Sequence, residues 1–386
     1  MKKLAIITSH PIQYYAPVFK LLEQRQQISI KVFYTWGKQA ENKFDPGFNK
    51  SIQWDIPLLE GYPYEWAENT SPQPGSDHFK GIINPGLINS LKSWQPDALL
   101  VIGWSYQSHL KVIRYFKGKV PVMFRGDSTL LDEKKGLKSI IKSVFLTWLY
   151  HHVDHAFYVG VNSKAYFKRY GLKNDQLSFA PHAIDNERFA LKRDKETLHL
   201  REALSLNEKD ILILFAGKLE AKKAPLHLLE AFLSINKPNI HLLFVGNGPL
   251  ESELRYMSKG NGNIHFMEFQ NQSQMPAIYQ ACDLFCLPSV GPGETWGLAV
   301  NEAMACGKAI IASDKVGCSV DLVHNELNGT VFNAGNINDL TNKLMELTRD
   351  IDLLKTYGAE SQTIIKDWNF TNIALAIENK LLYETD

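Results

Sequence analysis

Short β-rich runs alternate with helical patterns along this sequence, and that alternation restricts the fold more than any other feature. In the first half of the chain the β-rich runs are residues 4–7, 28–34, 98–102, 120–124 and 156–159. Each run is followed by apolar residues at helical spacing. The alternation predicts an open parallel sheet with helices on both faces, because parallel strands need crossover connections.

A second series of the same kind follows a polar, charge-dense stretch. Its runs are residues 210–216, 240–245, 263–267, 284–287, 309–312 and 330–332. The sequence therefore predicts an α/β protein with two doubly wound, Rossmann-like domains that face each other across a cleft. The expected parts are an N-terminal domain of residues 1–190, a linker of residues 191–209, a C-terminal domain of residues 210–370, and a last helix within residues 371–386 that packs back on the N-terminal domain. Residues 44–77 are rich in Pro, Gly and aromatic residues and indicate an extended loop.

The composition is that of a soluble globular protein. The chain has 386 residues, of which 45% are hydrophobic and 22% are charged. No apolar run approaches the roughly 18 residues that a membrane-spanning helix needs. The first residues lack the pattern of a signal peptide, so we expect a cytoplasmic location. The four cysteines show no paired CxxC spacing, and we expect them to be reduced and structural.

Charge is distributed unevenly along the chain. Residues 1–190 carry 24 Lys and Arg against 16 Asp and Glu, whereas residues 191–386 carry 18 against 25. The basic first half suggests an anionic partner, but no helix-turn-helix, zinc-finger or RNP-like pattern favours nucleic acid. Lysines and apolar residues at helical spacing gather in residues 133–151 and predict a basic amphipathic helix. Either its apolar stripe packs on the protein's own core, or the helix makes peripheral membrane contact.

Residues 291–307, which read GPGETWGLAVNEAMACG, are the most informative segment for chemistry. A Gly-rich loop here leads into a helix near Gly297, and helix amino ends present N–H groups to anions or sugar hydroxyls. Glu294 and Glu302 are eight residues apart, about 12 Å along a helix, so they cannot act on one atom. They either hold the two ends of one nucleotide-sugar or are exposed glutamates that aid solubility.

A lysine cluster follows the strand predicted at residues 210–216. Lys218, Lys222 and Lys223 lie where that strand ends, a position that suits a diphosphate whose charge grows as it leaves a sugar carbon. The Walker A pattern is absent, so the loop is not a P-loop. The alternative is a set of ordinary solvated lysines.

Several motifs, taken in order, resemble family 4 glycosyltransferases of the GT-B fold. They are the E-x7-E spacing of Glu294 and Glu302, the Gly-Lys-Leu-x3-Lys run at residues 217–223, PHAIDNERF at residues 181–189, GNGP at residues 246–249, Pro288-Ser289, and EAMACGKAIIAS at residues 302–313. The resemblance covers most of the C-terminal domain. It implies retaining transfer of a sugar from a nucleotide donor that is held mainly by that domain.

The resemblance also implies roles for single residues. Lys223 resembles the family's diphosphate-binding lysine, and Lys218 stands where an arginine is usual, which keeps the charge but loses the bidentate fork. Glu302 resembles the glutamate that binds the ribose hydroxyls, and Glu294 the one near the donor sugar. Further donor-binding candidates are Gly217, the backbone N–H groups of Thr295, Trp296, Gly297 and Leu298, and, near the base, Phe269 and Gln270.

The first domain departs further from the family pattern. The family commonly has a Gly-Gly turn after the first strand, whereas this chain has a loop in which His10 and Gln13 are candidate hydrogen-bond donors to the diphosphate. After the strand at residues 120–124, where many members place a histidine, this chain has Arg125 and Asp127. We expect both to line the reacting centre.

These features together predict a retaining glycosyltransferase that moves a hexose-type sugar from a UDP- or GDP-linked donor to an acceptor hydroxyl. The expected acceptor is a glycan or a lipid-linked precursor of a cell-surface polysaccharide or glycolipid. We expect no metal ion or other cofactor. An epimerase or phosphorylase on the same fold, and a non-catalytic nucleotide-sugar-binding scaffold, remain alternatives because fold does not fix function.

Overall fold

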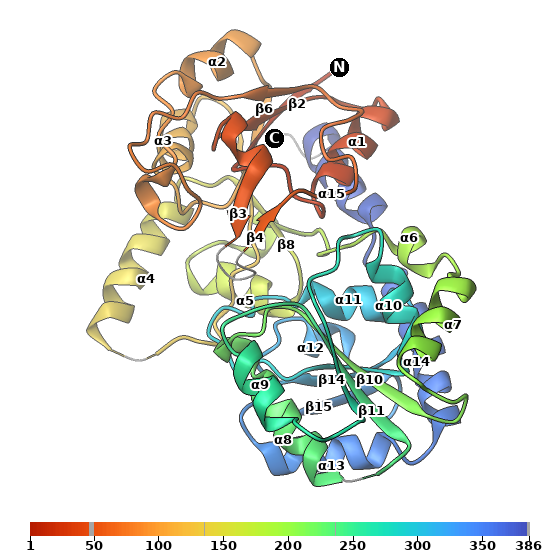
Figure 1. Cartoon of the computed structure of the whole chain (residues 1–386). Coiled ribbons are helices and arrows are strands. Elements are labelled where there is room, and N and C mark those ends of the chain that lie inside the picture. Colours follow the sequence, from red (N-terminus) through yellow and green to blue (C-terminus); the bar gives the residue numbers. More distant parts are fainter. Residues whose placement is uncertain (46–49, 135, 236, 384–386) are drawn as a thin grey trace. The chain divides into compact units, whose positions relative to one another are not determined.

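The computed structural model describes residues 1–45, 50–134, 136–235 and 237–383, which fall into two compact units (Figure 1). Unit 1 contains Met1–Lys43, Ile56–His182 and Phe370–Asp386, and unit 2 contains Phe44–Asp55 and Ala183–Asn369. Three parts of the sequence predictions lie outside the described residues: residues 46–49 of the expected loop, Lys135 of the basic helix and residues 384–386 of the last helix.

Unit 1 is built on a seven-stranded sheet with the strand order β5-β2-β1-β6-β7-β8-β9, and every pair of neighbouring strands is parallel. The strands are β1 (Lys3–Thr8), β2 (Ser29–Tyr34), β5 (Tyr64–Trp66), β6 (Ala98–Ile102), β7 (Val122–Arg125), β8 (His155–Tyr158) and β9 (Leu177–Phe179). The central strands are buried along almost their whole length, as expected for a parallel sheet covered on both faces.

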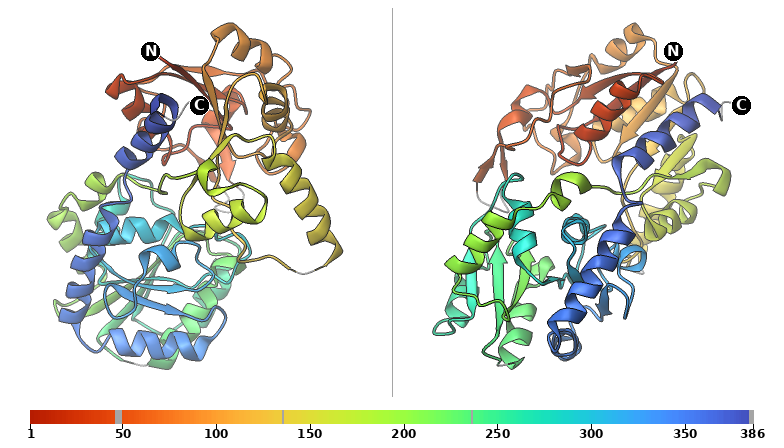
Figure 2. Two further views of the ribbon diagram at one scale, coloured as in Figure 1. Left: turned by 180° about the vertical axis from the view of Figure 1, so that it is seen from behind. Right: turned by 90° about the vertical axis from the view of Figure 1, so that its right-hand side faces the viewer.

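Helices cover both faces of this sheet (Figure 2). Apolar residues of α2 (Leu87–Trp94), α3 (Gln107–Phe116) and α4 (Leu137–Tyr150) join one core cluster with residues of the central strands. The helix α1 (Ala16–Arg25) packs against β2 and against α15 (Phe370–Tyr383). The remaining helices of unit 1 are η1 (Lys38–Asn42), η2 (Phe79–Gly81), α5 (Val161–Arg169) and η3 (Asn174–Gln176).

Unit 2 repeats the plan with a six-stranded parallel sheet in the order β12-β11-β10-β13-β14-β15. Its strands are β10 (Ile211–Ala216), β11 (Ile240–Val245), β12 (Ile264–Met267), β13 (Leu284–Leu287), β14 (Ala309–Ser313) and β15 (Gly329–Phe332). Its helices are α6 (Asn186–Ala190), α7 (Asp194–Ala203), η4 (Ala221–Lys223), α8 (Pro225–Ile235), α9 (Glu251–Met257), α10 (Met275–Ala281), α11 (Leu298–Ala305), α12 (Ser319–Leu322), α13 (Ile337–Leu347) and α14 (Ile351–Ile365). Residues of α8, α9, α13 and α14 form one core cluster with alternate residues of the strands. The predicted class, two doubly wound α/β domains, is confirmed.

Two regions differ in detail from the expectations. Residues 191–209 hold the helix α7, which packs against α10, so this stretch is part of unit 2. Within the expected loop of residues 44–77, β5 pairs with β2 as an edge strand, and the short strands β3 (Lys43–Asp45) and β4 (Lys50–Ile52) form a small sheet of their own. The strand β5 has only three residues, too few for an alternating pattern to give a strand signal.

Candidate active site

The candidate site of unit 2 lies where the order of its sheet reverses. The chain runs from β10 outward to β11 and β12, then returns to the other side of β10 to form β13. The loops after β10 and β13, residues 217–223 and 288–297, therefore diverge at the carboxyl edge of the sheet. Such a switch point is where α/β proteins place their ligands.

Two predicted residues meet at this edge. The Lys223 Nζ forms an ion pair with a carboxylate oxygen of Glu294, and the Ser289 hydroxyl donates to the same oxygen at 2.9 Å. The loops are also joined through the backbone, because the Val290 N–H donates to the Lys222 carbonyl at 2.8 Å. The Lys223 side chain is 19% exposed and that of Glu294 is 8% exposed, so a positive group and a negative group stand at the rim with little solvent around them. Charges this sheltered interact more strongly than they would in water.

A close backbone approach shapes the neighbouring loops. The Gly217 N–H donates to the Val245 carbonyl at 3.0 Å, and the Leu219 N–H donates to the Asn247 carbonyl at 3.0 Å. A Cβ atom at Gly246 would lie 2.1 Å from the Gly217 carbonyl oxygen, and Gly246 also has a φ of +132°. Only glycine fits there, which explains the first glycine of the GNGP motif. Lys218 lies between these contacts and is half-buried.

The helix α11 begins at the predicted position, with Gly297 as its N-cap in the left-handed conformation. The Val300 N–H donates to the Gly297 carbonyl at 2.8 Å, and N–H groups at the start of a helix suit an anion. The Trp296 side chain is buried, and its Nε1–H donates to the Asn301 Oδ1 at 2.9 Å. The indole of Trp296 therefore stabilises this turn. The backbone carbonyl of Trp296 accepts a hydrogen bond from the Cys318 N–H at 2.9 Å. Thr295 is half-buried.

Neither glutamate of the E-x7-E spacing is an exposed surface residue. Glu294 is 7% exposed and Glu302 is 5% exposed. The Glu302 Oε2 accepts a hydrogen bond of 2.9 Å from the Tyr279 hydroxyl on α10. The interpretation that these glutamates merely aid solubility is therefore wrong. Sequence reasoning did not identify Tyr279 and gave Ser289 no role beyond its place in the Pro288-Ser289 motif, because the contact of each with a glutamate is seen only in the structure.

Phe269 and Gln270 lie in the loop after β12. The Phe269 N–H donates to the Asn247 Oδ1 at 2.9 Å, and its ring centroid is 6.4 Å from that of Trp54. Ser273 in the same loop donates to the Asp55 carboxylate. Residues 53–55 thus border the loop after β12 within unit 2, a feature the sequence did not predict.

The predicted residues of unit 1 lie at the carboxyl edge of its own sheet. His10 and Gln13 are in the loop after β1, where the His10 Nδ1 lies 2.9 Å from the Ser9 hydroxyl and the imidazole meets the Trp36 ring edge-on at 5.3 Å. Gln13 is half-buried. Both residues follow β1. The strand order of this sheet reverses between β1 and β6.

Arg125 and Asp127 behave differently from each other. Arg125 is 1% exposed, and its two terminal nitrogens donate to the carbonyls of Ala180 and Pro181, each at 2.8 Å. Burial lowers the pKa of this guanidinium. Its observed contacts therefore hold the segment after β9 against the end of β7. The Asp127 side chain is 43% exposed and lies 3.9 Å from the buried His182 imidazole, whose pKa is lowered by burial.

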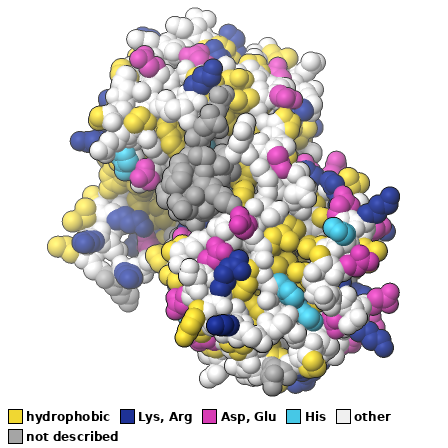
Figure 3. Space-filling model, viewed as in Figure 1, with side chains coloured by type: hydrophobic (Ala, Val, Ile, Leu, Met, Phe, Trp, Pro, Cys, Tyr) yellow, Lys and Arg dark blue, Asp and Glu magenta, His cyan; other side chains and the backbone are white. Residues whose placement is uncertain are grey.

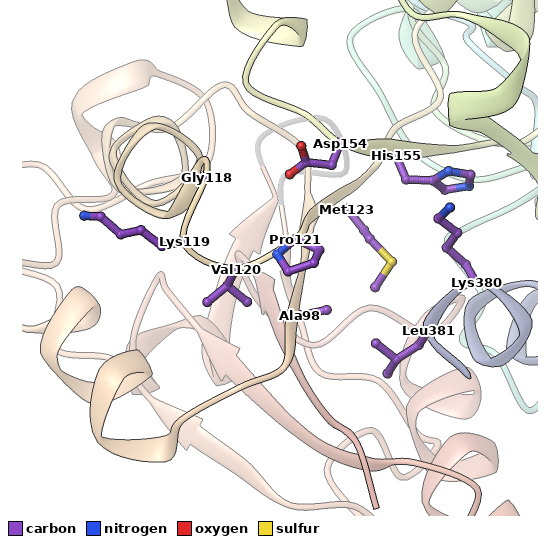
Figure 4. Close-up of a pocket in the computed structure, with 10 residues that line it drawn as sticks. All are labelled: Ala98, Gly118, Lys119, Val120, Pro121, Met123, Asp154, His155, Lys380 and Leu381. Atoms are coloured by element: carbon purple, nitrogen blue, oxygen red, sulfur yellow. The ribbon is translucent and has the colours of Figure 1, made fainter. Parts of the chain in front are cut away.

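One cavity lies away from these edges. A cavity of about 400 Å³ opens at the amino ends of β6, β7 and β8, and none of the predicted site residues lines it (Figure 4). Among the described residues, no group of three or more His, Cys, Asp or Glu side chains is placed to hold a metal ion. The four cysteines are buried thiols.

The geometry defines a two-unit α/β protein with a sheltered lysine–glutamate pair at a sheet switch point, and comparison with known proteins shows which proteins it resembles. Residues 197–363 match the family "Glycosyl transferases group 1". The predicted resemblance is therefore confirmed over the region that carries the E-x7-E spacing, Lys218 and Lys223.

The similar proteins that have curated names are glycosyltransferases. A sulfoquinovosyl transferase of Arabidopsis thaliana is 27% identical over 199 residues, which are 50% of this chain and 38% of that protein. An Escherichia coli galactosyltransferase, named as acting from UDP-Gal on an α-D-GlcNAc-diphosphoundecaprenol, is 29% identical over 181 residues, 45% of this chain and 46% of that protein. The chain thus spans less than half the length of these two relatives.

Solved structures show the same fold over the whole chain. HepE of Anabaena, crystallised with UDP, has a TM-score of 0.74 at 18% identity and covers 99% of each chain. A glycosyltransferase of Rickettsia africae has a TM-score of 0.74 at 14% identity and covers 100% of this chain and 99% of that one. The GT-B architecture predicted from the sequence is confirmed.

Proposed function

We propose that this protein is a retaining glycosyltransferase that moves a hexose-type sugar from a UDP- or GDP-linked donor to an acceptor hydroxyl. The observation that carries the proposal is the Lys223–Glu294 ion pair at the switch point of unit 2, inside the region of the family match. A switch-point site with a sheltered cation suits a diphosphate, and an adjacent carboxylate suits a sugar hydroxyl. The curated relatives, which are named as sugar transferases, support the same activity.

The chain's own groups supply the chemistry in this proposal. Lys223, Lys218 and the first N–H groups of α11 stabilise the negative charge that develops on the leaving diphosphate. The diphosphate accepts the proton of the acceptor hydroxyl on the same face of the sugar, so no side chain becomes glycosylated. Glu294 orients the donor sugar and Glu302 the ribose. Positive charge in this scheme comes from lysines and helix N–H groups, and we propose that no metal ion is required.

We further propose that the acceptor is a lipid-linked glycan precursor and that the protein works on the cytoplasmic side of a membrane as a peripheral protein. The named acceptor of the E. coli relative, a diphosphoundecaprenol, supports a lipid-linked acceptor. In the described part of the chain, no helix combines the length and the hydropathy needed to cross a bilayer. We therefore propose that the described residues contact the membrane only at its surface.

The donor proposal is tested by a thermal-shift screen against UDP, GDP, CMP and their sugars, with and without EDTA. We expect one nucleotide family to raise the unfolding temperature, to do so in the presence of the chelator, and to lose most of its effect in Lys223→Ala. Loss of one such charge costs roughly 2–4 kcal/mol in the transition state, about 30- to 1,000-fold in rate.

The neighbouring lysine provides a matched control. Lys222 is 40% exposed and pairs with Glu220 at 3.4 Å, so Lys222→Ala should bind the nucleotide like the wild type. The double variant Lys223→Ala/Glu294→Gln shows whether a lost thermal shift comes from lost nucleotide binding or from a buried carboxylate left without its cation. No shift with any nucleotide, or equal affinity in Lys223→Ala and the wild type, would overturn the proposal.

A further inference from the structure

Helix α4 has two apolar faces, and only one of them packs on unit 1. The inner face carries Leu146, Leu149 and Tyr150, which are buried. The outer stripe consists of Leu137, Ile140, Ile141, Val144 and Trp148, whose exposed fractions range from 40% for Trp148 to 75% for Leu137. The spacing of three, four, seven and eleven residues from the first to the last puts these five side chains on one side of the helix. The alternative in which all apolar residues of this helix pack on the protein's own core is therefore wrong.

The outward direction of the stripe is fixed by how α4 is held. The Phe145 ring lies 5.4 Å from that of Trp104, and the fully buried Leu146 and Leu149 belong to the main core cluster of unit 1. Lys142 is directed sideways, where its Nζ lies 3.2 Å from the Glu133 Oε1. The inner face therefore cannot turn outward without breaking the core, and the outer stripe stays in solvent.

Most charges around the stripe are positive, although Asp132 and Glu133 precede the helix. No acidic residue occurs in α4, while Lys134 and Lys138 are exposed at its amino-terminal end. At the other end, the exposed Arg114 places its guanidinium 5.4 Å over the Trp148 ring. In Figure 3 hydrophobic and basic side chains lie beside one another on the projection that α4 forms in the same view of Figure 1. An apolar stripe bordered by cations is complementary to a surface with anionic head groups above acyl chains.

We infer that the outer stripe of α4 docks unit 1 onto an anionic phospholipid surface. The aliphatic side chains enter the boundary between head groups and acyl chains, Trp148 sits at the level of the head groups, and the lysines reach lipid phosphates. The stripe is too small for a stable contact with a second copy of the chain. A 14-residue helix is about 21 Å long and 10 Å wide, so one face covers about 210 Å², far less than the roughly 800 Å² that each partner contributes to a standard interface.

This inference gives the proposed membrane location its surface and rests on that part of the proposed function. Its experiment needs neither donor nor acceptor, so its failure is distinguishable from failure of the proposed reaction. The full-length protein is sedimented with vesicles of phosphatidylcholine alone and with vesicles containing phosphatidylglycerol at 30 mol% (about one lipid in three). We expect binding to the anionic vesicles that is weakened by salt, and little binding to the zwitterionic ones.

Two variants and their controls test the surface itself. Ile140→Ser/Val144→Ser should lower the partition coefficient about tenfold or more, and Lys138→Glu should lower it at least about fivefold. Leu198→Ser/Tyr256→Ser makes the same kind of change at exposed apolar positions on α7 and α9, and should bind vesicles like the wild type. The exposed Lys195 on α7 provides the charge control as Lys195→Glu.

Circular dichroism and urea unfolding show whether each variant is folded, and all variants should unfold like the wild type because the changed side chains are exposed. Binding of the wild type that is absent, indifferent to anionic lipid, or equally reduced in the α4 variants and their controls would overturn the inference. So would a wild-type dimer in sedimentation velocity that Ile140→Ser/Val144→Ser converts to a monomer without changing vesicle binding.

Discussion

The hydrogen bond from Tyr279 to Glu302 gives a prediction at the scale of single residues. Tyr279→Phe removes a donor from a carboxylate that is 5% exposed. We expect the free energy of unfolding to fall by about 1–3 kcal/mol, because a buried charged acceptor loses part of its solvation. Urea unfolding measures the change. Tyr256→Phe, at a position 79% exposed, is the control and should leave stability unchanged. Equal stability of the two variants would show that this bond contributes nothing.

His109 predicts a pH dependence of stability. Its Nδ1 lies 2.8 Å from the Gly103 carbonyl and its Nε2 lies 2.8 Å from the Thr35 hydroxyl, and complete burial lowers the pKa of His109 to about 4. In the unfolded chain its pKa is about 6.5, so the unfolded state binds the extra proton first as pH falls. Stability is therefore fully present above pH ~6.5 and is lost toward pH ~4, with about 2 kcal/mol gone between pH ~7.5 and ~5.

The measurement is urea unfolding at the two pH values. His109→Gln should be less stable than the wild type at the higher pH and should lose about 2 kcal/mol less on acidification. A wild type with the same pH dependence as His109→Gln would contradict the assignment. The buried His182, whose pKa is also lowered by burial, acts in the same direction in both proteins.

Sequence reasoning singled out candidate residues that stand at strand ends and missed residues that meet them from elsewhere. Lys223 and Glu294 were predictable because parallel topology brings the carboxyl ends of β10 and β13 to one edge. Tyr279 comes from another helix, so nothing in its own surroundings in the sequence points to Glu302. Arg125 shows a different limit, because its sequence position does not tell what its side chain contacts. A polar residue at a strand end can bind a substrate or bind backbone carbonyls, and here its buried guanidinium contacts the carbonyls of Ala180 and Pro181.

At the scale of elements, α15 completes unit 1 from the far end of the sequence. Its apolar residues are buried beside α1, and the Glu378 carboxylate, 3% exposed, accepts two hydrogen bonds from the Arg25 Nε at 2.9 and 3.0 Å. Arg25→Ala leaves this carboxylate without its cation. We expect a loss of about 2 kcal/mol from the stability of unit 1, less than for a fully buried pair because Arg25 is 30% exposed. Arg25→Ala/Glu378→Gln should recover part of the loss in urea unfolding. No recovery would indicate that packing rather than charge is what Arg25 provides.

Elements were predictable where one physical pattern dominated. The strands β10 and β11 are buried at every position, and their runs of apolar residues, broken only by His241 in β11, marked them as strands. The helix α4 was predictable as a helix, but which of its faces packs on the core was not. Two apolar faces on one helix look like one broad stripe in the sequence, and only the contacts of Phe145, Leu146 and Leu149 decide which face is inside.

At the scale of the whole molecule, the two units have separate cores and should respond to different perturbations. One core cluster gathers residues of unit 1 and another gathers residues of unit 2, and the proposed nucleotide site belongs to unit 2 alone. We expect calorimetry to resolve two unfolding transitions. UDP or GDP at 100 times its dissociation constant should stabilise unit 2 by about 2.7 kcal/mol, which is about 5–10 °C for a unit of roughly 200 residues.

Arg25→Ala identifies the other transition, because its perturbed ion pair lies within unit 1. The nucleotide should raise the midpoint temperature of only the transition that Arg25→Ala leaves unchanged. Lys223→Ala should abolish that rise. If the nucleotide instead raises the midpoint temperature of the transition that Arg25→Ala lowers, unit 1 binds most of the donor. The lysine–glutamate pair of unit 2 is then not the main contact of the donor. The separation follows from topology, since each sheet has its own switch point and α15 returns to unit 1 to close the first core.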